Sequence, residues 1–206
     1  MDGPHTQAFW DARFEGEAYR FGEAPNAFLA RQAGRLSPGM SVLAVGDGEG
    51  RNGVWLAEQG LDVHSLDISP RAVDKARRLA ARRGLSIRAE VTDLLHWQWP
   101  PAVYDAVVAV FVQFAGPAWQ DRLFAGMKST VRPGGLIILE GYRPEQIAFG
   151  TGGPPDPTYM YTHDLLQAAF ADFEMLELAA YDAELSEGDA HAGLSAVIDL
   201  VARRPN

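Results

Sequence analysis

The sequence predicts an α/β fold, with an open, mostly parallel β-sheet and helices on both of its faces. From Ser41 onward, apolar strand-like runs alternate with helix-like segments, which is the pattern of strand–helix–strand units. The strand-like runs are almost continuously apolar, as expected for parallel strands that are covered on both faces. Residues 173–185 and 194–204 are strand-like runs joined by a loop too short for a crossover, so this last pair is expected to be antiparallel.

Strands and helices are expected to alternate along the chain before this pair. Strands are expected at residues 41–46, 62–67, 85–91, 104–112 and 134–142, the last of them after a turn at 132–135. Helices are expected at residues 51–60, 69–84, 117–131 and 162–171. The second of these helices has Ser69 as N-cap, Pro70 at its first position and Gly84 as its stop. One of its faces is apolar, and its basic residues lie elsewhere: Arg71, Lys75, Arg78 and Arg82.

The first 40 residues are expected to form a helical cap on this sheet. Residues 25–36 read as a helix, and an aromatic-rich stretch precedes it, with Phe9, Trp10, Phe14, Tyr19 and Phe21. These rings either cover a ligand or form a hydrophobic cap on the sheet. No linker is visible, so residues 1–206 are expected to form a single domain, with the cap at 1–40 and the core at 41–206.

Composition narrows the classes of partner. The chain has 206 residues and a formal net charge of −9, which disfavours nucleic acid and anionic membrane surfaces. It has no cysteine, no basic-then-apolar leader and no apolar run of the roughly 20 residues that span a bilayer. We expect the protein to be cytoplasmic and to be a monomer or homodimer. Its expected partner is a small molecule, and neither a nucleic acid nor a membrane is expected as a partner.

A glycine-rich turn, "VLAVGDGEGRNG", follows the first strand. In open parallel sheets, ligands bind beyond the carboxyl ends of the strands, and glycines there let the backbone approach a ligand closely. The turn lacks the Gly-Lys-Ser/Thr ending of a P-loop. Gly46, Gly48 and Gly50 alternate as Gly-x-Gly-x-Gly. The Gly-x-Gly-x-x-Gly spacing of a dinucleotide site is found only when counting starts at Gly48, and the motif would then begin too late after the strand.

Carboxylates end the next two strands. Asp67 lies about 20 residues past the glycines, where it would accept hydrogen bonds from ribose hydroxyls or else cap the following helix. Asp93 ends the third strand at the same edge of the sheet, where it would accept from an adenine amino group. These strand ends together predict a nucleoside-containing ligand.

The segment "VLAVGDGEGRNGVWLAEQGLDVHSLDISPRAVDKARRLA" resembles the S-adenosylmethionine site of class I methyltransferases. The closest resemblance is to small-molecule enzymes of the tellurite-resistance and thiopurine-methyltransferase type, and it extends from "YRFGEAPNAFL" through "RPGGLIILEGY" to "GTGGPPDPTYMYT". It implies a Rossmann-like, doubly wound sheet of seven strands with an antiparallel last strand, and S-adenosylmethionine as cofactor. The candidate cofactor-binding residues are Tyr19, Gly46, Asp47, Gly48, Asn52, Asp67, Ile68, Asp93, Leu94 and Val110.

The resemblance also assigns parts of the cofactor to these residues. It implies that residues 46–48 back the methionine part, that Asp67 binds the ribose and that Ile68 lies against the adenine. Asp93 and Leu94 would lie at the adenine rim. The sequence departs from the family pattern at Ala44, where many members carry an acidic residue, and at Asp47, where many carry a small one. Asp47 would then supply the missing negative charge.

Acceptor-side candidates follow the fourth and fifth strands and the last hairpin. Gln113 and Phe114 follow the fourth strand, and Tyr142 and Arg143 begin a long Gly- and Pro-rich loop, read as a substrate wall. Arg143 either binds an acidic substrate group or pairs with Glu140 or Glu145. His191, in the turn of the last hairpin, either acts as a general base or only fixes the turn. No histidine pair has metal-ligand spacing, so no metal site is expected.

The leading hypothesis is an S-adenosylmethionine-dependent methyltransferase that acts on a small molecule. The runner-up is a catalytically silent nucleoside-binding or sensing module on the same fold, suggested by the departure at Ala44. A nicotinamide reductase is a third, weaker alternative. The sequence leaves open whether the acceptor atom is oxygen, nitrogen, sulfur or a metalloid.

Overall fold

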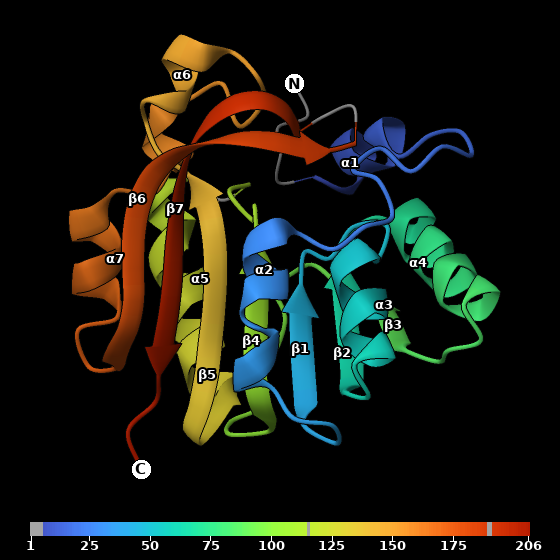
Figure 1. The fold of residues 1–206 in the computed structure, drawn as a ribbon, viewed down its shortest axis with the longest axis horizontal. Coiled ribbons are helices and arrows are strands. Elements are labelled where there is room, and N and C mark those ends of the chain that lie inside the picture. Colours follow the sequence, from blue (N-terminus) through green and yellow to red (C-terminus); the bar gives the residue numbers. More distant parts are fainter. Residues whose placement is uncertain (1–5, 115, 189–190) are drawn as a thin grey trace.

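A computed structural model describes residues 6–114, 116–188 and 191–206, which form one continuous seven-stranded sheet with helices around it (Figure 1). The strand order is β3-β2-β1-β4-β5-β7-β6. The strands are β1 (Ser41–Val45), β2 (Asp62–Asp67), β3 (Arg88–Val91), β4 (Tyr104–Val110), β5 (Val131–Tyr142), β6 (Glu174–Glu187) and β7 (His191–Arg203). The helices are α1 (Gln7–Arg13), α2 (Ala27–Arg31), α3 (Arg51–Glu58), α4 (Pro70–Arg82), α5 (Pro117–Thr130), α6 (Gln146–Phe149) and α7 (His163–Ala169), with short 3₁₀ turns η1 (Ala33–Arg35) and η2 (Pro157–Tyr159).

The pairing confirms the predicted sheet. Strands β3, β2, β1, β4 and β5 pair in parallel, whereas β7 is antiparallel to both β5 and β6. The strand order reverses between β1 and β4, which is where open α/β sheets bind ligands. Because β6 runs parallel to β5, the β6–β7 hairpin delivers its turn to this same edge.

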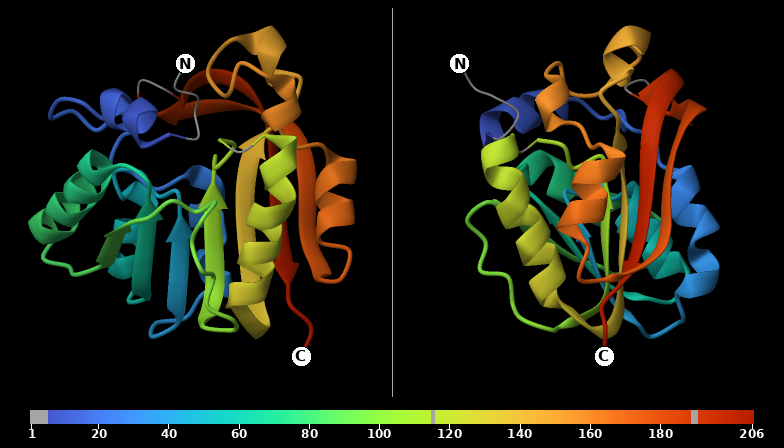
Figure 2. Two further views of the ribbon diagram at one scale, coloured as in Figure 1. Left: turned by 180° about the vertical axis from the view of Figure 1, so that it is seen from behind. Right: turned by 90° about the vertical axis from the view of Figure 1, so that its left-hand side faces the viewer.

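Helices cover both faces of the sheet. Figure 1 shows α2 and α3 in front of it, and Figure 2 shows α5 and α7 on the opposite face. Alternate residues of each strand supply the two cores, because successive side chains point to opposite faces. Val42 of β1 packs in the core under α2 and α3, and its neighbour Leu43 packs in the core under α5 and α7.

Several element boundaries differ from the predicted ones: β3 begins at Arg88 instead of 85 and β7 at His191 instead of 194, and three further differences have a local cause. β5 begins at Val131 instead of 134, because a register shift against Tyr104 and Ala106 absorbs the extra residues of the expected turn. The helix predicted at 25–36 is broken, since Gln32 ends α2 and the chain continues as η1. β4 stops at Val110 instead of 112, because Phe111 adopts a positive φ of 54°.

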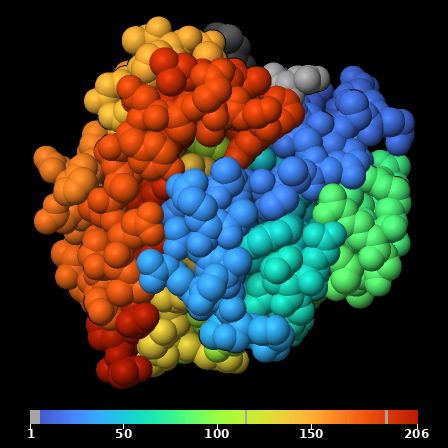
Figure 3. All heavy atoms as spheres, in the orientation of Figure 1, coloured from blue at the N-terminus to red at the C-terminus, as the bar shows by residue number. Residues whose placement is uncertain are grey.

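The N-terminal segment, residues 6–26, lies at the carboxyl edge of the sheet (Figure 1), and its surface fills the space between the β6–β7 hairpin and α4 (Figure 3). On the hairpin side the contact is through backbone: a Cβ at Gly188 would lie 2.5 Å from both the Arg20 oxygen and the Gly22 nitrogen. On the α4 side it is electrostatic. The buried Lys75 Nζ donates to the Ala18 carbonyl and pairs with Glu49 at 2.8 Å. The segment is therefore attached at both of its sides.

Candidate functional site

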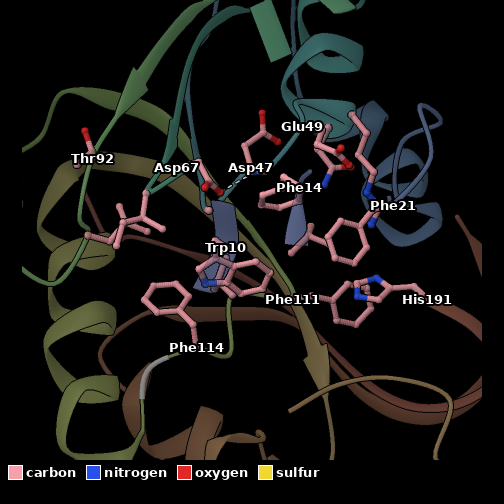
Figure 4. Close-up of a pocket in the computed structure, with 18 of the residues that line it drawn as sticks. Trp10, Phe14, Phe21, Asp47, Glu49, Asp67, Thr92, Phe111, Phe114 and His191 are labelled. Carbon is pink, nitrogen blue, oxygen red and sulfur yellow. Dashed lines mark hydrogen bonds between the residues drawn. The ribbon is translucent and has the colours of Figure 1, made fainter. Parts of the chain in front are cut away.

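One pocket lies at the carboxyl edge of β1, β2, β3 and β4, beneath the N-terminal segment (Figure 4). Its empty space, including the open mouth, is about 850 Å³. It is lined by Trp10, Phe14, Phe21, Gly22, Gly46, Asp47, Gly48, Glu49, Arg51, Asn52, Asp67, Ile68, Thr92, Asp93, Leu94, Val110, Phe111, Val112, Phe114 and His191. Sites for small ligands and cofactors are typically concave and mostly apolar with a few polar groups, and this lining has that character.

The glycine loop forms the floor of the pocket between β1 and α3. Gly46, Gly48 and Gly50 all have positive φ, at 58°, 57° and 86°. Such angles suit glycine because it has no Cβ. At Gly50 the backbone also touches α4, where an added Cβ would lie 2.6 Å from that of Ala76. The loop is thus held in a tight conformation that leaves its backbone facing the pocket.

Asp67 joins the end of β2 to this loop. Its carboxylate accepts hydrogen bonds from the Gly48 and Ser69 backbone N–H groups, each at 2.9 Å. Burial raises the pKa of Asp67 to about 6. Since each carboxylate oxygen has two lone pairs, acceptor capacity remains for a ligand.

Asp47 turns its carboxylate into the loop. One oxygen accepts from the Gly53 N–H at 3.1 Å and the other from the Ser65 hydroxyl at 2.7 Å. Burial raises the pKa of Asp47 to about 7. Asp47 lies three residues after Ala44, the position at which the family usually has an acidic residue, and its carboxylate ties the loop to α3 and β2.

The folded state holds the Asp47 proton more tightly than the unfolded chain does. The contribution of Asp47 to the free energy of unfolding is therefore fully present below about pH 4 and is lost as the pH rises to about 7. Asp47→Asn keeps one acceptor for Gly53 and one partner for Ser65. We expect this variant to gain up to roughly 2–3 kcal/mol more at pH 8 than at pH 5, at about 1.4 kcal/mol per pKa unit. Urea unfolding at the two pH values measures the difference; Asp121→Asn, on an exposed part of α5, is the control. Equal effects at both pH values would contradict the assignment.

Thr92, Asp93 and Leu94 reach the pocket from the end of β3. The Asp93 carboxylate accepts from the Leu95 N–H at 3.0 Å and lies 2.7 Å from His96 Nδ1. Asp93 is thus held by its own loop, at the end of the pocket farthest from the β6–β7 hairpin.

Aromatic rings form the wall and roof. Trp10 stacks on Phe14 at 5.7 Å between centroids, and Phe14 meets Phe21 edge-on at 6.0 Å. A Cβ at Gly48 would lie 3.4 Å from the Phe14 ring, so the roof rests on the glycine loop. From below, the strained backbone of Phe111 turns its ring toward His191, 4.4 Å away (Figure 4). Strain of this kind in a non-glycine residue is typical of functional sites.

The β6–β7 hairpin brings His191 and, behind it, Glu187. His191 packs against the rings of Phe21 and Phe111 and lies on the side of the pocket away from Thr92 (Figure 4). Glu187 Oε2 accepts from Arg51 Nη2 at 2.6 Å and lies 3.9 Å from His191 Nδ1. Polar groups from β6, β7 and α3 therefore meet beside the aromatic wall.

Most of the candidate residues from the sequence lie together in this pocket. Those that line it are Gly46, Asp47, Gly48, Asn52, Asp67, Ile68, Asp93, Leu94, Val110, Phe114 and His191. Tyr19, Gln113, Tyr142 and Arg143 are not among its lining residues.

These four side chains have structural partners instead. The Tyr19 hydroxyl donates to the Lys75 carbonyl at 2.9 Å, which fixes the N-terminal segment on α4. Gln113 uses both ends of its amide on the backbone of Tyr142, at 2.8 Å and 2.6 Å. The Tyr142 ring is buried and stacks on Phe111 at 4.5 Å. Arg143 pairs with Asp182 and with Glu145, as one of the two predicted alternatives anticipates.

Several residues that line the pocket are not predicted from the sequence. Phe111 and Val112 were assigned to the fourth strand, since both side chains favour strands. Arg51 was assigned only to the start of a helix, and Glu49 and Thr92 stand in loops without a distinguishing pattern. Glu187 does not line the pocket, but the sequence places it four residues before His191 in the hairpin turn that is expected at the ligand edge.

In the described part of the chain, no group of three or more histidine, cysteine or acidic side chains is arranged to hold a metal ion. No helix in the same residues combines the length and apolar character needed to cross a bilayer.

Comparison with known sequences identifies relatives of this chain. A family model described as a methyltransferase domain matches residues 42–135. The chain is 35% identical over 144 residues to a ribosomal protein L11 methyltransferase of Paraburkholderia xenovorans, covering 68% of this chain and 45% of that protein. It is 29% identical over 154 residues to Hemagglutinin 1 of Eikenella corrodens, covering 71% and 48%. The chain spans less than half the length of these curated relatives.

Solved structures share the fold over almost the whole chain. A protein that converts a disulfide bond into a thioacetal group during echinomycin biosynthesis superimposes with a TM-score of 0.80 at 22% identity, covering 97% of this chain and 91% of the other. TehB from Haemophilus influenzae gives 0.71 at 20% identity, covering 96% and 66%. The N-methyltransferase NodS from Bradyrhizobium japonicum, in complex with S-adenosylhomocysteine, gives 0.72 at 16% identity and full coverage of both chains.

The sheet order, the glycine loop and these matches define one class of protein. Residues 42–135 match a methyltransferase domain, and the whole chain has the fold of S-adenosylmethionine-dependent methyltransferases, for which S-adenosylmethionine is the cofactor. The fold and the methyltransferase resemblance predicted from sequence are confirmed, and TehB is among the structures that share the fold.

Proposed function

We propose that this protein transfers a methyl group from S-adenosylmethionine to a small-molecule nucleophile. The observation that carries the proposal is that three consecutive strand ends line one pocket: the glycine loop after β1, Asp67 and Ile68 after β2, and residues 92–94 after β3. An aromatic wall and a histidine adjoin them on the side of β4 and β7. Such an arrangement offers an elongated nucleoside a floor, a ribose acceptor and a place for its reactive end.

The residues present fit the cofactor. In this proposal Asp67 accepts hydrogen bonds from the ribose hydroxyls, in addition to its two backbone donors. Ile68, Asp93 and Leu94 surround the adenine, and the glycine loop with Val110 faces the methionine part. The cofactor, when bound, supplies a methyl group that is already activated by a positively charged sulfur.

The remaining task of the chain is to align the acceptor and exclude water. The rings of Trp10, Phe14 and Phe21 close the pocket from above, and those of Phe111 and Phe114 form its side. The methyl acceptor lies against these rings, and His191 takes its proton. A mostly apolar pocket under such a roof suits a small acceptor beside the cofactor.

Calorimetric titration with S-adenosylhomocysteine tests the proposal. We expect binding in the micromolar range, with a negative heat-capacity change from burial of apolar surface. Absence of binding at millimolar ligand, or a clear preference for a nicotinamide cofactor, would overturn it. Binding without methyl transfer to a broad panel of oxygen, nitrogen, sulfur and metalloid nucleophiles would favour the silent nucleoside-binding module.

A further inference from the structure

Glu187 is a buried carboxylate that joins three parts of the site without lining the pocket itself. Its Oε2 accepts from Arg51 Nη2 of α3 at 2.6 Å. Its Oε1 accepts from Asn26 Nδ2 at 2.9 Å and from the Ala27 N–H at 3.2 Å, both at the start of α2. Oε2 also lies 3.9 Å from His191 Nδ1 on β7. The groups within hydrogen-bond distance of Glu187 are all donors and favour its charged form, whereas the buried carboxylate of Glu140 on β5, which shares the Asn26 amide, opposes it.

The charge of Glu187 is maintained despite its burial. Burial alone would raise the pKa of Glu187, but the His191 ring and the Arg51 guanidinium outweigh it and lower the pKa to about 2. One anion and one cation thus lie side by side, each with about 7% of its side chain exposed. The negative charge stands directly behind His191 over the whole neutral pH range.

The ring of His191 is held in one orientation. Phe21 and Phe111 pack against it with centroids at 4.5 Å and 4.4 Å, and Tyr142 meets it edge-on at 5.7 Å. Nδ1 is fully buried on the side of Glu187 and has no hydrogen-bond partner in the described chain. Since His191 lines the pocket, the ring presents its other edge to a ligand.

The charged groups around His191 act in opposite directions. Burial lowers the pKa of His191, the carboxylate of Glu187 raises it, and the cations Arg51 and Arg20 lower it further. Together these influences lower the pKa of His191 below its ordinary value, which favours the neutral ring that a proton acceptor needs. A neutral histidine beside a carboxylate directs its single N–H toward the carboxylate, which leaves the opposite nitrogen with a free lone pair.

We infer that Glu187 is a positioning residue for His191: it fixes the Nδ1–H tautomer and so makes Nε2 the base that faces the methyl acceptor. The inference rests on the proposed function and deepens it, because the acceptor then carries a dissociable proton on its nucleophilic atom, as a hydroxyl or N–H group does. The lone pair of that atom forms the new bond to the methyl carbon. The carbon–sulfur bond breaks with its electron pair on sulfur, and the acceptor's proton passes to His191 Nε2. The imidazolium so formed lies beside the Glu187 carboxylate.

The 3.9 Å separation is longer than a direct hydrogen bond. Catalytic hydrogen bonds are often long without ligand and shorten when the site closes. A ligand pressed against the rings of Phe21 and Phe111 would push His191 toward Glu187. The tautomer should therefore be set in the free protein and become more rigid in the complex with S-adenosylhomocysteine.

Nitrogen and carbon NMR of ¹⁵N,¹³C-histidine in the full chain tests this directly, with His191 assigned by loss of its signal in His191→Gln. We expect the Nδ1–H tautomer in the wild type. In Glu187→Gln, where the charge is lost, we expect His191 to titrate at least about one pH unit lower, a tenfold loss of proton affinity. Glu184→Gln, three residues earlier and exposed on the same strand, is the matched control and should leave the titration unchanged.

The result that overturns the inference is an Nε2–H tautomer in the wild type, or an unchanged His191 titration in folded Glu187→Gln. Should Glu187→Gln fail to fold, because Arg51 is left unpaired, the tautomer of the wild type decides. These readings need neither cofactor nor acceptor. Failure of the proposed function, seen as absent S-adenosylhomocysteine binding, is therefore distinguishable from failure of the Glu187–His191 assignment.

Discussion

Replacing Asp67 with alanine is expected to weaken S-adenosylhomocysteine binding by on the order of 100-fold. In the proposed complex this carboxylate accepts hydrogen bonds from two ribose hydroxyls. Bonds to a charged acceptor are worth about 1.5–3 kcal/mol each, and about 1.4 kcal/mol corresponds to a factor of ten in affinity. Calorimetry on the wild type and the variant measures the loss.

Asp67 also supports the glycine loop through Gly48, so a loss of affinity by itself would not identify the ribose contact. A 2′-deoxy analogue of S-adenosylhomocysteine separates the two effects. It should bind the wild type about tenfold more weakly than the parent ligand, and it should bind Asp67→Ala as well as the parent does. Equal discrimination between the two ligands by both proteins would show that Asp67 acts only on the loop.

Asp93→Ala is the matched comparison at the next strand end. Its carboxylate is engaged by Leu95 and His96 within its own loop, so a smaller loss of affinity is expected than for Asp67→Ala.

The affinity for S-adenosylhomocysteine should also depend on pH through Asp67. Because burial raises the pKa of Asp67 to about 6, affinity in the wild type should fall as pH decreases below 6, and this fall should be absent in Asp67→Ala.

The parts of the site that sequence could predict are those encoded by local pattern. Gly46, Gly48 and Asp67 each follow directly on a recognisable strand, and the topology of a parallel sheet brings such strand ends to one edge. The same reasoning placed the hairpin turn and His191 there, once the last strand pair was read as antiparallel. No side-chain detail was needed for these predictions.

What sequence could not predict depends on contacts between distant residues. The φ of 54° at Phe111 depends on its N–H bond to the Glu140 carbonyl across the sheet. Gln113 has the polarity of a ligand-binding residue, yet its amide is consumed by the backbone of Tyr142. The sequence groups Lys75 with the surface arginines of its helix, but only 2% of its side chain is exposed. It is buried against Glu49 of the glycine loop, 26 residues away in the sequence, and no local pattern indicates that contact.

That buried pair leads to the second large expected effect. In Lys75→Met, Glu49 keeps its hydrogen bond from the Arg20 N–H at 2.7 Å but loses its cation at 2.8 Å. Breaking a buried pair by removing one partner costs about 3–5 kcal/mol, because the remaining charge is desolvated and uncompensated. The free energy of unfolding of a native protein is about 5–15 kcal/mol, so a loss of this size should be clear in urea unfolding.

The double variant Lys75→Met/Glu49→Gln distinguishes this cause from simple loss of packing. Glutamine still accepts from Arg20 and carries no charge, so most of the lost stability should return. Arg78→Met, which breaks the exposed pair with Glu17 at 3.8 Å, should cost at most about 0.5 kcal/mol. If the double variant were no more stable than Lys75→Met, the buried charge would not be the cause.

The same pair connects stability to the site, because it holds residues 18–20, directly before Phe21 in the aromatic roof. Lys75→Met should therefore loosen the N-terminal segment more than it loosens the sheet. Relative to the wild type, Lys75→Met should increase the hydrogen-exchange rate more at the Arg20 amide than at the amides of the buried strands β1 and β4. Arg78→Met should leave the rates at both places unchanged. Uniform acceleration across both regions would mean that Lys75 stabilises the whole fold and has no separate role in closing the pocket.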